Sequence, residues 1–315
     1  MSATRYPLAA TLFISVLLSA CTPQNETKQE AVSDTDAPVE THVFKEEVKT
    51  RQALTQVALG RETAELVIQN VTLLNVFTQE WLPAQDIVIA HNRIAWVGDT
   101  GTWPGETQNS YDANGLWAVP GFGESHKHIE SSYLTPEYEA ALVIPHGNTW
   151  TVEGSHEISN VVGNRNAEFW LEAERKGSAL KIFPAIGSAT PPTVYESGGG
   201  YYRYNEMRDF LTYDPRVVAL GEVMDWSAVI NADNGGHQRI WEMIEATYDY
   251  RGVVEGHGMN LTSQTDISAF AAAGLASDHE VRLADEGIEK LRRGVFLEIK
   301  QAGMDSLFPK LLEIG

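Results

Sequence analysis

Short apolar runs that alternate with helix-like stretches constrain the fold of this chain more than any other feature. Seven such runs follow Leu116, namely WAVPGF, NTWTVEG, LKIFPAIG, VVALGEV, GVVEGHG, AGLASDH and VFLEIKQ. Strands separated by helices build a parallel sheet, because each helix returns the chain across the face of the sheet. The pattern predicts an α/β fold, a TIM-like (β/α)8 barrel over residues 117–315, with about seven strands present and the eighth missing.

Candidate metal ligands stand at the ends of four of these runs. His126 and His128 follow the first run within PGFGESHKHIESS, and a strand that reaches them presents both on one side. Glu222, His257 and His279 close later runs. Taken singly, each has a plain alternative: a turn or core histidine, a solvated carboxylate, or a histidine beside a helix cap. Together they suit two divalent metal ions (Mn, Fe or Zn) bridged by a carboxylate and a hydroxide.

Composition narrows the partners. The chain has 315 residues, of which 43% are hydrophobic, and this is enough for a sizeable core. The formal net charge of −20 repels phosphate backbones, so we expect no nucleic-acid partner. Cysteine occurs once, at Cys21, so we expect neither an internal disulfide nor a cysteine metal ligand. The sequence leaves oligomerisation open.

The N-terminus has the features of a targeting signal. Arg5 precedes LAATLFISVLLSA, which is short for a bilayer span, and Leu18-Ser19-Ala20-Cys21 resembles the bacterial lipoprotein signal. We interpret residues 1–21 as a signal peptide, Cys21 as the lipidated residue, and a membrane as the partner of this anchor. Thr22 stands where an inner-membrane retention signal favours Asp, so we expect the periplasmic face of the outer membrane. The alternative is a buried cysteine after a transmembrane anchor.

Two segments lie between this signal and the barrel. Residues 22–62 are rich in Glu, Gln, Thr and Asp and poor in aromatic residues, which predicts a disordered acidic tether with a short helix near 46–58. Residues 63–116 alternate apolar and polar positions and carry turn residues such as Asn70 and Asn92. This pattern predicts a small β domain.

The order of motifs resembles the amidohydrolase superfamily, and within it the bacterial adenine deaminases. The matching strings are VPGFGESHKHIESSYLTP, HEISNVVG, DPRVVALGEVMDW, EGHGMNL, AAGLASDHE and IEKLRRGVFLEI, and the likeness runs from about residue 65 to residue 315. The resemblance implies a hydrolase of C–N bonds whose small-molecule substrate is a purine base: adenine and water give hypoxanthine and ammonia. It also implies that residues 63–116 are the N-terminal part of a composite β-sandwich.

Carried over position by position, the resemblance assigns metal ligands. It implies that His126 and His128 bind one metal ion, that Glu222 bridges, and that His257 and His279 bind the second. Two such ions lower the pKa of a shared water toward about 7 and so supply a nucleophile at neutral pH.

Two carboxylic acids beside the ligand motifs are candidates for catalysis. The ring nitrogen next to the attacked carbon of adenine must be protonated, and Glu130 or Glu280 is placed in the sequence to do this. Either residue could instead be a solvated loop carboxylate or a salt-bridge partner.

The chain departs from the family pattern at several positions. Glu124 stands where the family has Asp, and Lys127 stands between the two histidines, where we expect it to point away from the metals. Gly154-Ser155 precedes His156-Glu157 in place of Asp-Pro. Lys300-Gln301-Ala302-Gly303 replaces an Arg-Glu-Gly-Ser type of string, so a different substrate is an open alternative.

The resemblance also implies an eighth strand with a metal-binding aspartate that moves the proton, and this chain stops before it. We therefore expect little adenine deaminase activity from these 315 residues alone. Two alternatives remain beside the deaminase: an amidohydrolase that acts on another cyclic amide or a peptide-like substrate, and a catalytically inactive, truncated lipoprotein.

Lipidation of Cys21 can be tested in cells that are fed a labelled fatty acid. We expect the label on the wild-type protein and none on Cys21→Ala, because the thiol is the acceptor. The Thr22→Asp variant is the matched control, since it keeps the thiol and should carry the label in the inner membrane. Label that persists on Cys21→Ala contradicts the interpretation.

Overall fold

The computed structural model describes residues 44–314. The predicted signal peptide, Cys21 and the first half of the predicted tether lie outside the described residues. Within the described part of the chain, no helix is both long and apolar enough to cross a membrane. The chain divides into two compact units, one formed by the residues up to Ile68 with Asp86–Tyr111, and the other by Gln69–Gln85 with the residues from Asp112 onward.

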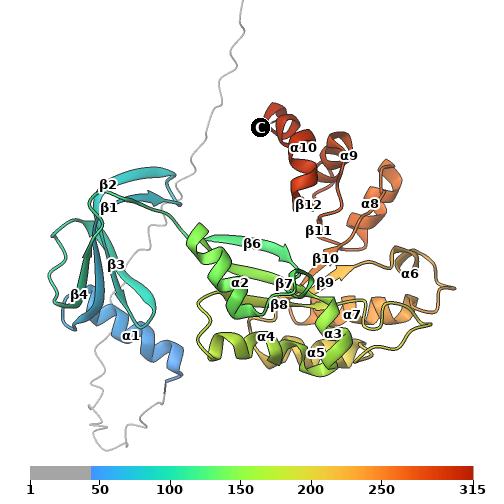
Figure 1. Ribbon diagram of the computed structural model, residues 1–315, viewed down its shortest axis with the longest axis horizontal. Helices are drawn as coiled ribbons and strands as arrows, with labels where there is room; N and C mark the ends of the chain where they lie inside the picture. Colours follow the sequence, from blue (N-terminus) through green and yellow to red (C-terminus); the bar gives the residue numbers. More distant parts are fainter. Residues whose placement is uncertain (1–43, 315) are drawn as a thin grey trace, which may run out of the picture. The chain divides into compact units, whose positions relative to one another are not determined.

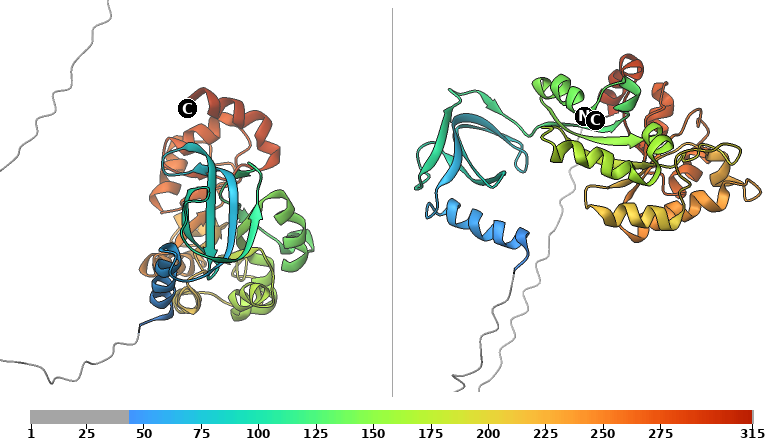
Figure 2. Two further views of the ribbon diagram at one scale, coloured as in Figure 1. Left: turned by 90° about the vertical axis from the view of Figure 1, so that its left-hand side faces the viewer. Right: turned by 60° about the horizontal axis from the view of Figure 1, so that its bottom comes forward.

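The N-terminal strands form one sheet, whose strands lie side by side in cyan and blue in the left view of Figure 2. The elements are α1 (Glu46–Ala58), β1 (Ala64–Asn75), β2 (Glu80–Ala90), β3 (Arg93–Asp99), β4 (Thr107–Asp112) and β5 (Trp117–Ala118). The strand order is β3-β2-β1-β4, and β5 pairs with β1 in parallel. His91 and Asn92 join β2 to β3 with positive φ angles of 52° and 57°, as a tight hairpin turn requires.

Helix α1 lies in the segment interpreted as the tether, so that segment is helical over part of its described length. Val57 of α1 is buried in an apolar cluster with Val67 and Val88. The indole nitrogen of Trp103 donates to the carbonyl oxygen of Val57 at 3.0 Å. The helix occupies the residues for which the sequence predicted a short helix, near 46–58, and the buried Val57 and the Trp103 hydrogen bond attach its end to the strands.

The second sheet is parallel throughout. It contains β6 (Phe122–Lys127), β7 (Asn148–Ser155), β8 (Lys181–Gly187), β9 (Ala219–Val223) and β10 (Val253–Gly256), in the order β10-β9-β8-β7-β6. Strands β11 (Ser277–Asp278) and β12 (Phe296–Leu297) form a parallel pair. The amide of Ala276 donates to the carbonyl oxygen of Val254 at 2.8 Å, which carries the sheet from β10 toward β11. Within residues 44–314, β6 and β12 do not pair, so the curled sheet is open (Figure 1).

The α/β prediction is confirmed. Six of the seven predicted apolar runs overlap the strands β7 to β12, whereas the first run, WAVPGF, contains β5 and ends at Phe122, where β6 begins. The helices between and after them are α2 (Pro136–Val143), α3 (His156–Val162), α4 (Asn166–Arg175), α5 (Tyr204–Tyr213), α6 (Trp226–Ile230), α7 (His237–Asp249), α8 (Gln264–Ala272), α9 (Ala284–Leu291) and α10 (Gln301–Ile314). Short 3-10 turns occupy Glu130–Ser132, Ile144–His146 and Gly163–Arg165.

The main core lies between this sheet and the helices α4, α5 and α7, which run along one face of it in Figure 1. Ile240 and Ile244 recur along α7 at the spacing of one helix face, and both are buried. They pack in one cluster with Leu171 of α4, Ile186 of β8 and Leu220 of β9. Burying side chains of this size contributes about 1.5–3 kcal/mol each.

A buried ion network fixes the ends of β10 and β11. The Nζ atom of Lys290, which is 0% exposed, donates to the carbonyl oxygen of Gly258 at 2.8 Å, to Glu286 Oε1 at 2.6 Å and to the Asp278 carboxylate. Asp278 Oδ1 in turn accepts from the amides of Gly258 and Glu280, at 2.8 and 3.1 Å. Helix α9 therefore holds both strand ends by charge-assisted hydrogen bonds.

We expect Lys290→Met to lower the free energy of unfolding by about 3–5 kcal/mol, because two buried carboxylates then lose their cation. Denaturant unfolding followed by circular dichroism measures it. Lys176→Met is the matched control, since Lys176 is exposed and its ion pair with Glu172 spans 4.0 Å, and should cost less than about 1 kcal/mol. Equal losses in the two variants would show that the network does not stabilise the fold.

Candidate metal centre

Six potential ligands meet where the parallel strands end. His126 lies in β6 and His128 directly after it, His156 begins α3 after β7, Glu222 lies in β9, His257 follows β10, and His279 follows β11. Parallel strands bring their carboxyl ends to one edge of the sheet, so residues far apart in sequence become neighbours there. The five ligands predicted from sequence are brought together by the fold.

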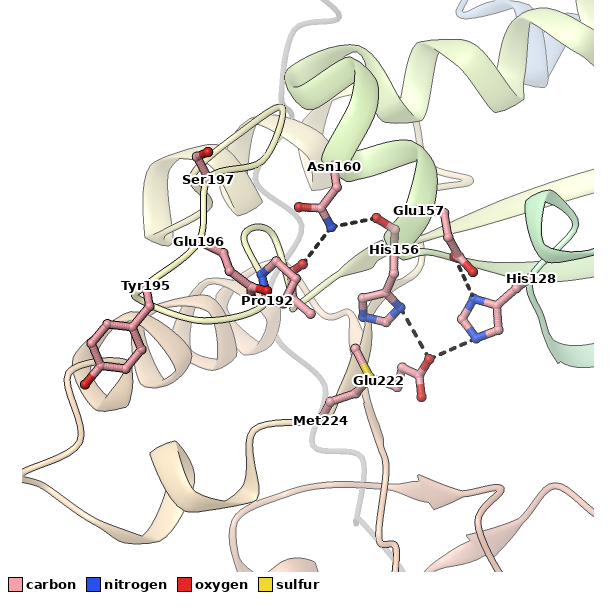
Figure 3. Close-up of a pocket in the computed structure, with 11 residues that line it drawn as sticks. His128, His156, Glu157, Asn160, Pro192, Tyr195, Glu196, Ser197, Glu222 and Met224 are labelled. Carbon is pink, nitrogen blue, oxygen red and sulfur yellow. Dashed lines mark hydrogen bonds and ion pairs between the residues drawn. The ribbon is translucent and has the colours of Figure 1, made fainter.

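The carboxylate of Glu222, which is 4% exposed, contacts four of the histidines, and Figure 3 shows it beside two of them, His128 and His156. Its Oε1 atom is 2.9 Å from His128 Nε2 and 3.3 Å from His156 Nδ1. Its Oε2 atom is 2.6 Å from His257 Nδ1 and 3.0 Å from His279 Nε2. Each oxygen therefore has its own set of imidazoles.

His126 completes the arrangement. Its ring stacks on the ring of His279 with centroids 4.1 Å apart, and its Nε2 atom lies 4.0 Å from Glu222 Oε1. The donor atoms of His126, Glu222 and His279 lie within 4.8 Å of one another, and so do those of His128, His156 and Glu222. A third group joins the predicted pair His257 and His279 with Glu280, whereas the predicted pair His126 and His128 is divided between the other two groups.

The donor set fits divalent metal ions. Imidazole nitrogens and a carboxylate are ligands that Zn, Fe and Mn accept. The Nε2 atoms of His126 and His156 are buried and make no hydrogen bond within the described structure, so their lone pairs are free for a cation. Buried polar atoms without a partner are costly, and a bound ion would remove that cost.

The pKa values of Glu222 and of two of the histidines favour the binding of cations. Burial opposes ionisation of Glu222, but its hydrogen bonds with four histidines outweigh burial and hold its pKa well below the usual range. Burial lowers the pKa of His126 to about 4, and burial also lowers the pKa of His279. Neutral His126 and His279 beside an ionised carboxylate are the protonation states that metal binding needs. Burial opposes protonation of His128, but its hydrogen bond with Glu222 outweighs burial and raises the pKa of His128.

Two further carboxyl groups lie near the Nδ1 atoms of His126 and His279. Glu255 Oε2 is 3.1 Å from His126 Nδ1, and Glu298 Oε2 is 3.8 Å from His279 Nδ1. Burial and the charge of Glu222 raise the pKa of Glu255 to about 7, and burial and the charge of Glu255 raise the pKa of Glu298 to about 8. The hydrogen bond with Glu255 fixes which nitrogen of His126 faces the metal. Glu298 Oε2 and His279 Nδ1 are too far apart for a hydrogen bond, and neither atom has a hydrogen-bond partner within the described residues.

Sequence analysis did not identify His156 or Glu255 as parts of this site. His156 is the first residue after β7, so the strand-end argument that found the other ligands applies to it equally. Glu255 stands two residues before His257, the spacing that puts side chains of a strand on one side.

The two candidate acids lie on different sides of the group. Glu130 Oε1 accepts from the amide of Ile158 at 3.3 Å, and its Oε2 is buried without a hydrogen-bond partner. Glu280 Oε1 lies 3.7 Å from His279 Nε2 and accepts from Lys300. Burial opposes ionisation of Glu280, but Lys300 outweighs it and lowers the pKa, which holds Glu280 as a carboxylate.

Lys127, between the two histidines of the motif, does not join the ligands. Its Nζ atom donates to the buried carboxylate of Glu139 in α2.

Two cavities open onto the ligand group. One of about 780 Å³ is lined by His128, His156 and Glu222 and by a wall that includes Glu157, Asn160, Pro192, Tyr195, Glu196 and Met224 (Figure 3). The other, of about 560 Å³, is lined by His126, His279, Glu298 and Lys300. Both volumes are in the range of small-molecule sites.

A parallel sheet whose strand ends gather imidazoles around one carboxylate defines an amidohydrolase-type protein. No protein-family model matches the chain. "Adenine deaminase 2" of Bradyrhizobium diazoefficiens is 54% identical over 270 residues, which is 86% of this chain and 43% of that protein. The chain is an adenine deaminase-like member of the amidohydrolase superfamily.

Other relatives extend the likeness. "Adenine deaminase 2" of Jannaschia sp. is 51% identical over 89% of this chain and 46% of that protein, and "Adenine deaminase" of Halalkalibacterium halodurans is 35% identical over 82% and 42%. The chain thus spans less than half the length of these curated relatives.

Among solved structures, N-acyl-D-glutamate deacylase of Bordetella bronchiseptica is 16% identical with a TM-score of 0.49, covering 75% of this chain and 58% of that one. An amidohydrolase is 14% identical with a TM-score of 0.48, covering 79% and 69%.

Metal content tests the centre. We expect Glu222→Gln to lose bound metal, because an amide replaces the one carboxylate that both histidine triads share, whereas wild-type protein should hold about two ions per chain. Elemental analysis after loading with Mn²⁺ and desalting measures this. His237→Ala is the control, since His237 bonds the carbonyl oxygen of Ala228 far from the ligands. Unchanged metal in Glu222→Gln sinks the assignment.

Proposed function

We propose that the whole protein hydrolyses adenine to hypoxanthine and ammonia. The observation that carries the proposal is the set of histidines around Glu222 at the floor of a cavity of about 780 Å³. Identity of 51–54% to proteins named adenine deaminase, along 86–89% of this chain, supports adenine as the substrate.

His126, His128, His156, Glu222, His257 and His279 would hold two divalent ions, Mn, Fe or Zn. When bound, such ions make water a nucleophile at neutral pH. Glu222 stays ionised and fixes the histidines on both sides of itself. Adenine would enter the larger cavity with C6 toward this floor, where water adds to C6 and the amino group leaves as ammonia.

Two protons must move: one passes from the attacking water to the purine ring nitrogen as the C6–O bond forms, and the other passes from the added hydroxyl to the amino group as the C6–N bond breaks. Glu157 lies on the cavity wall, 3.7 Å from His128 Nδ1, and bonds the hydroxyl of Ser131. Burial opposes ionisation of Glu157, but the Ser131 hydrogen bond outweighs it and lowers the pKa. An ionised Glu157 can accept the proton and return it, with Glu130 close to the same histidine.

A second candidate is hydrolysis of another cyclic amide on the same centre. Lys300, which replaces an arginine of the family pattern, lines the smaller cavity and pairs with Glu280. Gln301, which replaces a glutamate of the family pattern, lines the same cavity, and the loss of that negative charge favours a substrate with an additional acidic group. A panel of adenine, hydantoins and N-acyl amino acids discriminates between the two candidates.

We also propose a location in the cell envelope, held by lipid on Cys21. The support is the lipoprotein-like string Leu18-Ser19-Ala20-Cys21 alone.

We expect Glu157→Gln to lower kcat for adenine by about 10²- to 10⁴-fold with bound metal unchanged, because the amide cannot carry the proton. Ammonia release by the metal-loaded whole protein is the measurement. Glu196→Gln is the control, because Glu196 is an exposed residue of the wall of the same cavity. A change at the wall alters substrate binding rather than proton transfer, so this variant should keep kcat within about threefold. Wild-type activity in Glu157→Gln rules out its proton role, and a wild-type protein that releases no ammonia from adenine rules out the proposed function.

A further inference from the structure

Arg239 of α7 is a buried cation that the metal centre does not use. The residue is 4% exposed, and no ion pair joins it to a carboxylate within residues 44–314. Its guanidinium instead donates to backbone carbonyl oxygens: Nη1 to Ser188 at 3.1 Å and Thr190 at 3.2 Å, and Nη2 to Pro191 at 3.2 Å. Burying a charge is costly, so a buried arginine whose hydrogen bonds go to carbonyl oxygens should have a structural role.

The carbonyl groups belong to the loop that joins β8 to α5, residues 188–203. This loop supplies Ala189, Pro192, Tyr195, Glu196 and Ser197 to the wall of the larger cavity. Residues 192–199 are exposed, so burial of side chains does not hold them. Figure 3 shows Pro192 to Ser197 along the loop that passes Asn160 and His156.

Among residues 44–314, the hydrogen bonds that tie the loop to its surroundings lie near its two ends. Asn160 Nδ2 donates to the carbonyl oxygen of Ala189 at 2.8 Å, and the amide of Gly199 donates to the carbonyl oxygen of Asn160 at 2.7 Å. At the far end the buried hydroxyl of Tyr202 donates to the carbonyl oxygen of Gly163 at 2.7 Å. The Arg239 guanidinium also lies over the ring of Tyr201, 5.7 Å from its centroid. Arg239 thus contacts both the first and the last residues of the loop.

The planar fork of arginine is what makes this contact possible. Its rigid donors reach several carbonyl oxygens at fixed angles, whereas the ammonium of lysine is a compact point charge. Buried carbonyl groups that lose such donors would have to move or remain unpaired. The start of the loop should therefore depend on Arg239 specifically, and not on a positive charge alone.

We propose that Arg239 is a positioning residue for substrate binding, because it fixes the loop at residues 188–191 and so shapes the wall of the larger cavity. The proposal rests on the proposed function, since it assigns the wall to adenine binding. Arg239 contacts none of the ligands around Glu222, and Ser188 is held to the main chain of Glu222 and Gly221 by its own hydroxyl and amide, at 2.6 and 3.2 Å. Arg239 should therefore act on substrate affinity and not on the chemical step. A loosened loop has to be ordered when the substrate binds, and that ordering weakens binding.

The test is Arg239→Lys in the metal-loaded whole protein. We expect the KM for adenine to rise about tenfold with kcat nearly unchanged, the signature of lost binding that is uniform through the reaction. We also expect hydrogen exchange to speed up in peptides from residues 188–203, while peptides from β8 and β9 and the bound metal stay as in the wild type.

Arg216→Lys is the matched control. The Arg216 guanidinium also makes three hydrogen bonds, but to carboxylates: Nε and Nη2 donate to Asp214 at 3.1 Å, and Nη1 donates to Glu174 at 2.6 Å. Arg216 lines neither cavity. Tyr201→Leu is a second variant that removes only the half-exposed ring under the guanidinium. It should fold and shift KM and loop exchange in the same direction to a smaller degree.

The outcomes separate the two proposals. Unchanged loop exchange and KM in Arg239→Lys overturn the positioning role, and so does faster exchange that spreads through β8 and β9 with loss of metal. If Arg239→Lys does not fold, Tyr201→Leu without any effect on loop exchange overturns it as well. If the wild-type protein releases no ammonia from adenine, the proposed function fails, and exchange confined to residues 188–203 still supports the loop contact for another substrate.

Discussion

The structure depends on one buried carboxylate that four imidazoles contact. Glu222 cannot be ionised inside a protein without partners, because the desolvation cost is large. Its partners lie at the ends of β6, β7, β10 and β11, so its charge is stable only when the ends of those strands meet. Fold and site are therefore one arrangement: the sheet brings the histidines together, and the carboxylate makes their proximity favourable.

Much of this could be predicted from the chain, and the limits are physical. The strands were found because parallel strands buried on both faces are continuous apolar runs. His156 was missed because its neighbours were read as a departure from a family motif, although it follows β7 directly. The burial of Lys290 could not be predicted, because Glu-Lys at this spacing is typical of an exposed helix face. Only the tertiary position of Asp278 makes that lysine internal.

Two helices outside the ligand group hold the loops that surround it, by opposite electrostatic means. Lys290 of α9 compensates two carboxylates and fixes the ends of β10 and β11. Arg239 of α7 has no carboxylate and bonds main-chain oxygens after β8. The first device acts on residues adjacent to His257 and His279, and the second acts on the cavity wall. Stability of the metal centre and shape of the cavity can thus change independently of each other.

The order of the ligands along the chain has a consequence for biosynthesis. A ribosome delivers His126, His128 and His156 first, then Glu222, and His279 last. The early histidines have no shared carboxylate when they emerge, so a nascent chain offers cations only weak, separate imidazoles. High affinity arises once β9 to β11 have joined the sheet, because the free energy of metal binding is then part of the free energy of folding. If the group binds metal as proposed, capture would follow the pairing of β9 to β11, when all six potential ligands are in place.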